Sequence, residues 1–111
     1  MNDNMKTIFV AREFSPAPAG RFFEDGSSTG QKFREKFLLP AFENGGVIVD
    51  FFGTELPGSS FFEEAFGGLV REGMTEAVLN SRLKIRSPRE SDEKRIRKFI
   101  HDEAVRSGRL T

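Results

Sequence analysis

Two adjacent serines, Ser59 and Ser60, stand where a loop containing glycine and proline leads into a stretch with helical periodicity. The N-terminus of a helix presents unpaired backbone N–H groups and the positive end of the helix dipole, so it accommodates an anion or a phosphoryl group. A phosphate there would change the local charge by about −1.5 to −2. Ser60 also has Glu63 three residues later, the spacing of a capping box. The pair is therefore a candidate phosphoacceptor and partner-binding site, with helix capping as the alternative.

Four carboxylates lie in or near the same region, namely Asp50, Glu55, Glu63 and Glu64. They could converge at the carboxyl end of a central strand, where α/β sheets commonly bind ligands. The chain contains no cysteine and a single histidine, His101, so it offers no thiolate metal ligand. We predict no catalytic residue, no metal site and no cofactor, and therefore not an enzyme. Glu63 and Glu64 are candidate partner-binding residues because they lie within one helical turn of the serines.

The net charge is zero, but its distribution along the chain is uneven. Residues 1–81 carry 7 basic and 12 acidic side chains, whereas residues 82–111 carry 10 basic and 5 acidic ones. The basic end could attract nucleic acid or an acidic partner, or it could be a solvated helix face that neutralises the acidic part. The candidate anion or nucleic-acid contacts are Arg21, Lys94, Arg95, Arg97 and Lys98. No recognisable nucleic-acid-reading motif accompanies them.

Strands and helices alternate in the hydrophobic pattern that must position these side chains. The expected elements, in chain order, are strands at 7–11 and 21–23, a helix from Ser28 that ends before Asn44, a strand at 46–52, a helix from Ser60 through Val70, a short helix or turn at 75–80, an edge strand at 83–86, and a last helix from Ser87 or Ser91. This order is typical of an α/β fold.

Three local features refine these elements. Ser28 and Gln31 have the spacing of a second capping box. Pro40 lacks an N–H group and crowds the preceding turn, so the helix is expected to kink or restart there. Gly67 and Gly68 lie inside the next helix at a cost of about 1 kcal/mol each relative to alanine, which indicates close packing against the backbone.

The middle strand, 46–52, is an almost unbroken apolar run, which predicts burial on both faces beneath helices. Thirteen phenylalanines without tyrosine or tryptophan predict a core built on phenylalanine. At 111 residues the chain is expected to form one domain, 1–111. It shows no signal-peptide layout and no apolar run of membrane-spanning length, so we expect a cytoplasmic protein without membrane association.

The segments "PAPAGRFFEDGSSTGQKFREKFLLPAF" and "VIVDFFGTELPGSSFFEEAFGGLVR" resemble the STAS-like family, a domain of unknown function. That family combines an early Gly-Arg-aromatic, a Ser/Gly-rich loop before a Phe-Arg-Glu helix, and a strand ending in Asp. A Ser-Ser-Phe-x-Glu-Glu helix start and Phe-Gly-Gly-Leu then follow. The resemblance covers residues 16–72 closely. It implies a small mixed or mostly parallel sheet of about four strands covered by helices.

The layout is also distantly similar to STAS domains that act as bacterial anti-sigma-factor antagonists. In those domains a serine that opens the helix after the central strand is phosphorylated by a partner with a histidine-kinase-like ATPase fold. By that resemblance Ser59 takes the phosphoacceptor position and Ser60 the next one. Gly58 stands where the motif has Asp, and Phe61 where it has Gly.

We therefore expect a non-enzymatic protein-interaction module in bacterial signalling or regulation, which docks a partner near Ser59 and Ser60. A histidine-kinase-like ATPase is the candidate partner that the resemblance implies. The alternative is a nucleic-acid-associated regulator that uses the basic last helix.

Overall fold

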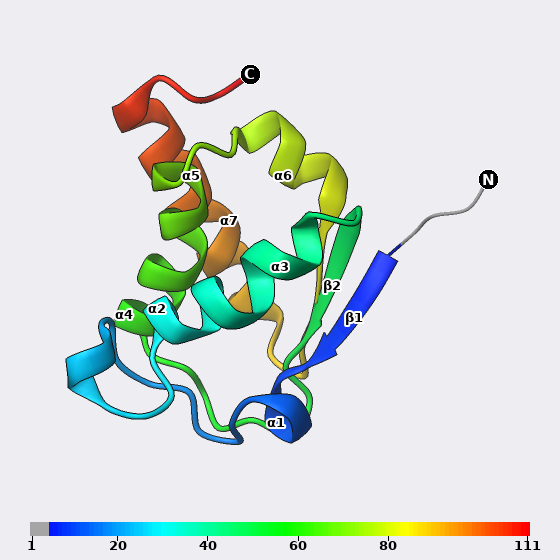
Figure 1. The fold of residues 1–111 in the computed structure, drawn as a ribbon, viewed down its shortest axis with the longest axis vertical. Helices are drawn as coiled ribbons and strands as arrows, with labels where there is room; N and C mark the ends of the chain where they lie inside the picture. Colours follow the sequence, from blue (N-terminus) through cyan, green and yellow to red (C-terminus); the bar gives the residue numbers. More distant parts are fainter. Residues whose placement is uncertain (1–4) are drawn as a thin grey trace.

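Strands and helices alternate along the chain in the computed structural model, which describes residues 5–111 (Figure 1). The elements are β1 (Met5–Phe9), α1 (Val10–Glu13), a 3₁₀ turn (Phe23–Asp25), α2 (Gly30–Phe33), a π-helical segment (Arg34–Leu38), α3 (Leu39–Phe42), β2 (Gly46–Asp50), α4 (Ser59–Phe62), a second π-helical segment (Glu63–Gly67), α5 (Gly68–Arg71), α6 (Glu76–Arg82), β3 (Leu83–Arg86) and α7 (Glu90–Ser107). Each π-helical segment joins its neighbours into one continuous helix, helix 30–42 and helix 59–71 respectively.

The sheet is parallel and has the order β1-β2-β3. The expectation of about four strands is wrong, because residues 5–111 contain three. The predicted strand at 21–23 does not form, since its backbone bonds to the start of the next helix. The Phe23 N–H donates to Oε1 of Gln31, and the Gln31 N–H donates to the Arg21 carbonyl. These hydrogen bonds hold the segment against helix 30–42 instead of in the sheet.

The first strand lies two residues earlier than the predicted span of 7–11. Its last pair in the sheet joins Phe9 to Asp50. The Phe9 N–H donates to a carboxylate oxygen of Glu13 at 3.0 Å, so the chain turns directly into α1. The short helix α1 therefore replaces the end of the predicted strand.

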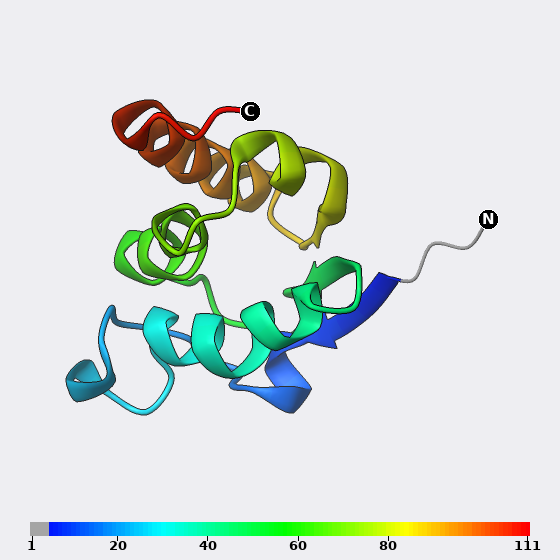
Figure 2. The same cartoon turned by 45° about the horizontal axis from the view of Figure 1, so that its top comes forward.

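The three longest helices lie side by side, with helix 59–71 between helix 30–42 and α7 (Figure 2). They cover one face of the sheet, on which Ile8, Val47, Val49 and Leu83 are buried. The prediction that the middle strand is buried on both faces is wrong, because Ile48, on the opposite face, is only half-buried. Parallel connections are almost always right-handed, so a strand order that advances in one direction places every connecting helix on the same face.

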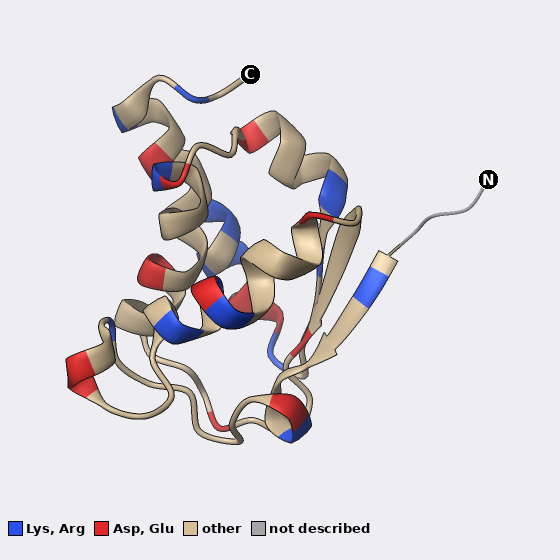
Figure 3. Cartoon of the chain, viewed as in Figure 1, with Lys and Arg blue, Asp and Glu red and all other residues tan. Residues whose placement is uncertain are grey.

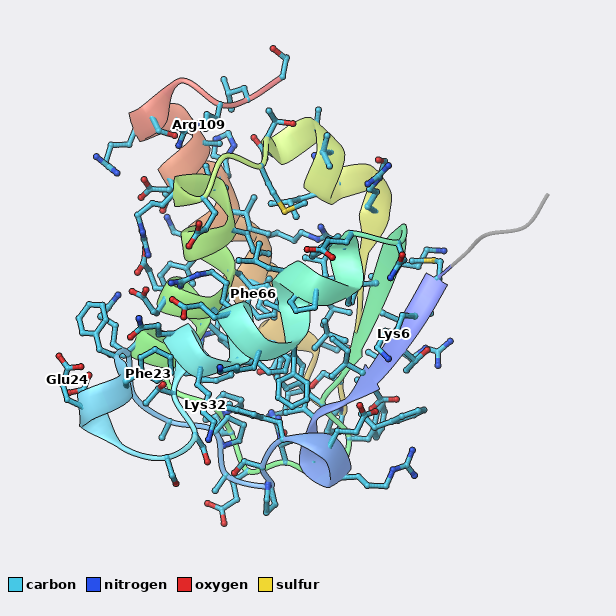
Figure 4. The ribbon with its side chains drawn as sticks, viewed as in Figure 1. Lys6, Phe23, Glu24, Lys32, Phe66 and Arg109 are labelled. Carbon is cyan, nitrogen blue, oxygen red and sulfur yellow. The ribbon has the colours of Figure 1, made fainter. Side chains whose placement is uncertain are left out.

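The core is built on phenylalanine, as the composition predicts. Phe33, Phe51, Phe61, Phe62 and Phe66 are fully buried, and their rings contact one another at tilted or edge-on angles. The ring centres of Phe51 and Phe62, for example, lie 5.6 Å apart. Such contacts stabilise the core beyond the area that they bury. Phe66 lies in the middle of the molecule in Figure 4, whereas the side chain of Phe23 lies at its edge, on the 3₁₀ turn.

The start of helix 30–42 differs from the predicted capping box. Thr29, not Ser28, is the N-cap residue, and its hydroxyl accepts from the Lys32 N–H at 3.3 Å. Gln31 cannot complete the box because it binds Phe23. The helix continues past Pro40, and the wider hydrogen-bond spacing of the π-helical segment ends just before α3.

Close packing at the predicted glycine pair is confirmed. A Cβ atom on Gly68 would lie 2.9 Å from the guanidinium carbon of Arg34, and one on Gly67 would lie 2.8 Å from a carboxylate oxygen of Glu63. Gly30 makes a third such contact, where a Cβ atom would lie 2.7 Å from the Phe61 carbonyl oxygen. Glycine at positions 30 and 68 lets helix 30–42 and helix 59–71 lie close together, whereas the Gly67 contact lies within helix 59–71.

Candidate functional site

The serine pair lies at the junction that the sequence predicts, in the first turn of helix 59–71. Both serines are exposed. The predicted capping box of Ser60 and Glu63 does not form: Gly58 is the N-cap, and none of the side chains of residues 5–111 makes a cap hydrogen bond there. Neither hydroxyl is therefore committed to capping.

Arg95 on α7 reaches the first of these serines. Its Nη2 donates to Oγ of Ser59 at 2.9 Å, and its guanidinium carbon lies 5.0 Å from the ring centre of Phe62. The ring face and the hydroxyl together hold this cation next to Ser59. The sequence predicted Arg95 as an anion contact and Ser59 as a phosphoacceptor, but gave no sign that α7 brings them together.

The loop at 51–58, between β2 and the serines, is tied down at several points. Arg89 donates to the Thr54 carbonyl at 3.0 Å and to the Thr54 hydroxyl at 2.9 Å. Nε of Arg89 also donates to the buried carboxylate of Asp92 at 2.9 Å. The Glu55 N–H donates to the Pro16 carbonyl at 2.8 Å, which joins the loop to the segment that follows α1.

Two large apolar side chains of this fixed loop face solvent. Phe52 is 56% exposed and Leu56 is 62% exposed. Fixed loops that expose apolar groups are common in binding surfaces, because little conformational entropy is lost when they are covered. Sequence reasoning missed both residues. Phe52 was assigned to the end of the predicted strand at 46–52, whereas β2 ends at Asp50 and Phe52 lies in the Gly/Pro loop that follows.

Glu63 and Glu64 are both held by arginines: Glu64 by one from helix 30–42, and Glu63 by one from its own helix and one from the loop before the 3₁₀ turn. Oε2 of Glu64 accepts from Nη1 of Arg34 at 2.8 Å, and both side chains are almost fully buried. Glu63 accepts from Arg21 and also from Arg71, whose Nη1 lies 2.7 Å from Oε2. The predicted cation Arg21 is thus paired within the chain.

Arg71 extends this network to the last helix through Glu103, at 3.1 Å. The hydrogen bond from Arg71, with the charges of Arg71 and Arg21, holds the pKa of Glu63 below its ordinary value. The hydrogen bond from Arg106, aided by Arg71, likewise lowers the pKa of Glu103. The network fixes helix 59–71 between its two neighbours and so fixes the direction in which the serines emerge.

The predicted convergence of four carboxylates is not found. Asp50 accepts from the Phe52 N–H at 2.9 Å, Glu55 is exposed on the loop, and Glu63 and Glu64 lie in the arginine network. Within residues 5–111 no cluster of three or more His, Cys, Asp or Glu side chains could hold a metal ion.

Three of the predicted cations of the last helix, Lys94, Arg97 and Lys98, line a groove of about 860 Å³ between α6, β3 and α7, whereas Arg95 does not. Arg97 donates to the carbonyl of Leu83 at 2.6 Å and to that of Leu79 at 3.3 Å. Lys98 pairs with Asp102, and His101 pairs with Glu76. Lys94 lines the groove and is exposed, with Glu90 and Glu93 beside it. Acidic and basic side chains both line the groove, so it does not present a field of one sign. Figure 3 shows the same mixture of signs along the whole ribbon.

Residues 29–93, more than half of the chain, match the family model described as "STAS-like domain of unknown function (DUF4325)". The chain belongs to this STAS-like family. The matched part of the STAS-like domain runs from the Thr29 cap to the first turn of α7, and includes the exposed loop and the serine pair. No curated protein and no solved structure matches the chain. Among residues 5–111, no helix has both the length and the apolar character needed to cross a membrane.

Proposed function

We propose that this STAS-like domain is a non-enzymatic protein-interaction module in bacterial signalling or regulation. Its docking surface consists of Phe52, Leu56, Ser59 and Ser60. One observation carries the proposal: a loop held by Arg89 and Pro16 exposes two large apolar side chains and leads directly into two exposed hydroxyls. Apolar groups on a rigid frame provide the contact area of a protein interface.

Phosphorylation of Ser59 is the regulatory step that we propose for this surface. A phosphate on Oγ would lie at a helix N-terminus and within reach of the Arg95 guanidinium, both of which stabilise negative charge. The two nearby carboxylates, Glu63 and Glu64, are neutralised by arginines and therefore oppose the added charge less than their sequence positions suggest. The new charge would weaken binding to a partner that covers Phe52 and Leu56.

A partner with a histidine-kinase-like ATPase fold is the candidate implied by the distant similarity to STAS domains that act as anti-sigma-factor antagonists. The test mixes the purified domain with such an ATPase, first without ATP and then with it. Without ATP we expect a complex on size exclusion. With ATP we expect the mass of the domain to increase by one phosphate, on Ser59, and the complex to dissociate. The double variant F52A/L56A should form no complex, whereas S81A, which removes an exposed hydroxyl on α6, should behave as wild type. An unchanged mass together with no complex would contradict the proposal.

Binding of nucleic acid by the last helix has less support. Arg95, Arg97 and Lys98 each have a partner within the chain. Acidic residues also line the groove between α6, β3 and α7 in which Arg97 and Lys98 lie. Nucleic-acid binding would require these cations to exchange their present partners for phosphates. Strongly salt-dependent binding to duplex DNA would favour this alternative over the docking module.

A further inference from the structure

The outer face of the sheet is left without a covering layer by the described chain. Side chains alternate between the two faces of each strand, and the pairing places Thr7, Ile48 and Lys84 in one row across the outer face. The next row joins Phe9, Asp50 and Arg86. Lys84 and Arg86 are exposed, Phe9 is 37% exposed, and Thr7 and Ile48 are half-buried.

A bare face is unusual for a sheet made only of parallel strands, because such sheets are normally covered on both faces by helices. A strand order that reverses direction along the chain supplies both layers, since it sends right-handed connections to opposite faces. The order β1-β2-β3 does not reverse, so both of its connections cover the inner face. Residues 5–111 therefore supply no second layer for the outer face.

The chemistry of the outer face is basic around an apolar centre. Ile48 lies in the middle, with Lys84 and Arg86 on the β3 side. Beyond the other side lies Arg12, whose guanidinium carbon is 4.5 Å from the ring centre of Phe9. Asp50 is the one carboxylate on this face of the described strands, and it is nearly buried and accepts from the Phe52 N–H. Beside Arg12 on α1, the Glu13 carboxylate accepts from the Phe9 N–H at 3.0 Å.

We propose that this face binds an amphipathic helix of a partner protein whose apolar stripe is flanked by carboxylates. The stripe would cover Ile48 and Thr7, as the inner helices cover Val47 and Val49. Carboxylates on either side would reach Arg12 and the pair Lys84 and Arg86. Complementary charge of this kind fixes the orientation of a helix and raises its rate of association.

Two other occupants fit less well. A second copy would bring the same cations against this face, so like charges would repel. Single-stranded nucleic acid is usually held by successive stacked aromatic rings, but the described strands place one aromatic residue here, Phe9, and Arg12 lies over its ring.

The test is a selection on the full chain from a displayed library of helical peptides about 20 residues long, enough to cross a small domain. Apolar positions are restricted to leucine and alanine, and each polar position encodes glutamate or lysine equally, so the protein selects the charge. We expect glutamate-rich helices with micromolar affinity, which shift the backbone amide signals of β1, β2 and β3 in NMR spectra. The double variant K84E/R86E should bind these helices at least about tenfold more weakly. If charge reversal disturbs folding, K84Q/R86Q removes the same two charges without reversing them and should show the same loss of affinity.

Matched controls separate this face from the groove and from the docking surface. The variant K94E/K98E makes the same charge change on α7 and should bind the selected helices within about twofold of wild type. F52A/L56A should also bind them normally, so this proposal and the proposed function can fail independently. The proposal would be overturned if the selection gave no helix or gave lysine-rich helices. It would also be overturned if K84E/R86E bound the helices as well as wild type does, or if a single-stranded oligothymidylate displaced the helix at physiological salt.

Discussion

The guanidinium group of Arg34 lies against the backbone of Gly68, where a Cβ atom would stand 2.9 Å from the guanidinium carbon. This contact lets a nearly buried arginine from helix 30–42 reach both the carboxylate and the backbone carbonyl of Glu64 on helix 59–71. The ion pair between Arg34 and Glu64 therefore requires that residue 68 has no side chain.

Replacing Gly68 with alanine is expected to destabilise the protein, although alanine favours helix by about 1 kcal/mol. The new methyl group would displace Arg34 and leave the buried Glu64 carboxylate without its partner, and breaking a buried pair costs about 3–5 kcal/mol. Urea unfolding followed by far-ultraviolet circular dichroism measures the change. G58A is the control: a Cβ atom there meets nothing within 4 Å, so the loss should not exceed about 1 kcal/mol, the cost of alanine at this N-cap. Wild-type stability in G68A would show that the pair tolerates displacement.

Capping threonines and the serine pair should respond differently to alanine. Thr75 accepts from the Val78 N–H at 3.1 Å, so T75A should lower the free energy of unfolding by about 1 kcal/mol. Ser60 is exposed and is not the N-cap, so S60A should change it by less than about 0.5 kcal/mol. Thermal and urea unfolding of both variants give the comparison. An equal loss of stability in S60A would show that Ser60 caps the helix, as the sequence predicts, and would contradict this prediction.

Stability should fall in mild acid because Glu63 and Glu103 are held by arginines. The pKa of each is lower in the folded protein than the ordinary value of 4.5, so the unfolded chain takes up protons first as the pH falls. Their stabilising contribution is therefore complete above the unfolded pKa and is lost as the pH drops through the folded pKa. Urea unfolding at a series of pH values from neutral to acidic should show this loss. The double variant E63Q/E103Q should show a shallower fall, whereas E24Q, at the exposed 3₁₀ turn, should follow wild type.

Arg97 is expected to matter more for stability than its neighbour Lys98. R97M would leave the partly buried carbonyls of Leu79 and Leu83 without their charged donor, at a cost of about 1–3 kcal/mol. K98M would break an exposed pair with Asp102, which contributes at most about 1 kcal/mol. Chemical unfolding of the two variants side by side measures the difference. Equal losses would mean that the carbonyls find other donors.

The sequence predicted those elements whose periodicity is unbroken. The edge strand Leu83–Arg86 alternates apolar and basic residues, and the structure has it at these residues. In the last helix, Ile96 and Ile100 lie four residues apart on one helical face, and both are buried. The position of the serines at the start of a helix was predicted for the same reason, since a Gly/Pro loop precedes an apolar stripe.

Contacts between distant residues decided what the sequence could not. The spacing of Ser60 and Glu63 permits a capping box, but Gly58 is the N-cap and the Glu63 carboxylate binds Arg21 and Arg71. The apolar run Val47–Val49 is compatible with a strand covered on one face or on both. The order of the strands decides between the two, and this order is not encoded in the run itself. No local pattern links Arg95 to Ser59, 36 residues apart.

The core is made of phenylalanine and the chain contains no tyrosine or tryptophan, so this protein absorbs very little light in the near ultraviolet and has no tryptophan fluorescence. Any tryptophan emission from a mixture with another protein would therefore come from that protein alone. A change in that emission on mixing would report binding directly, without a dye or a label on either molecule.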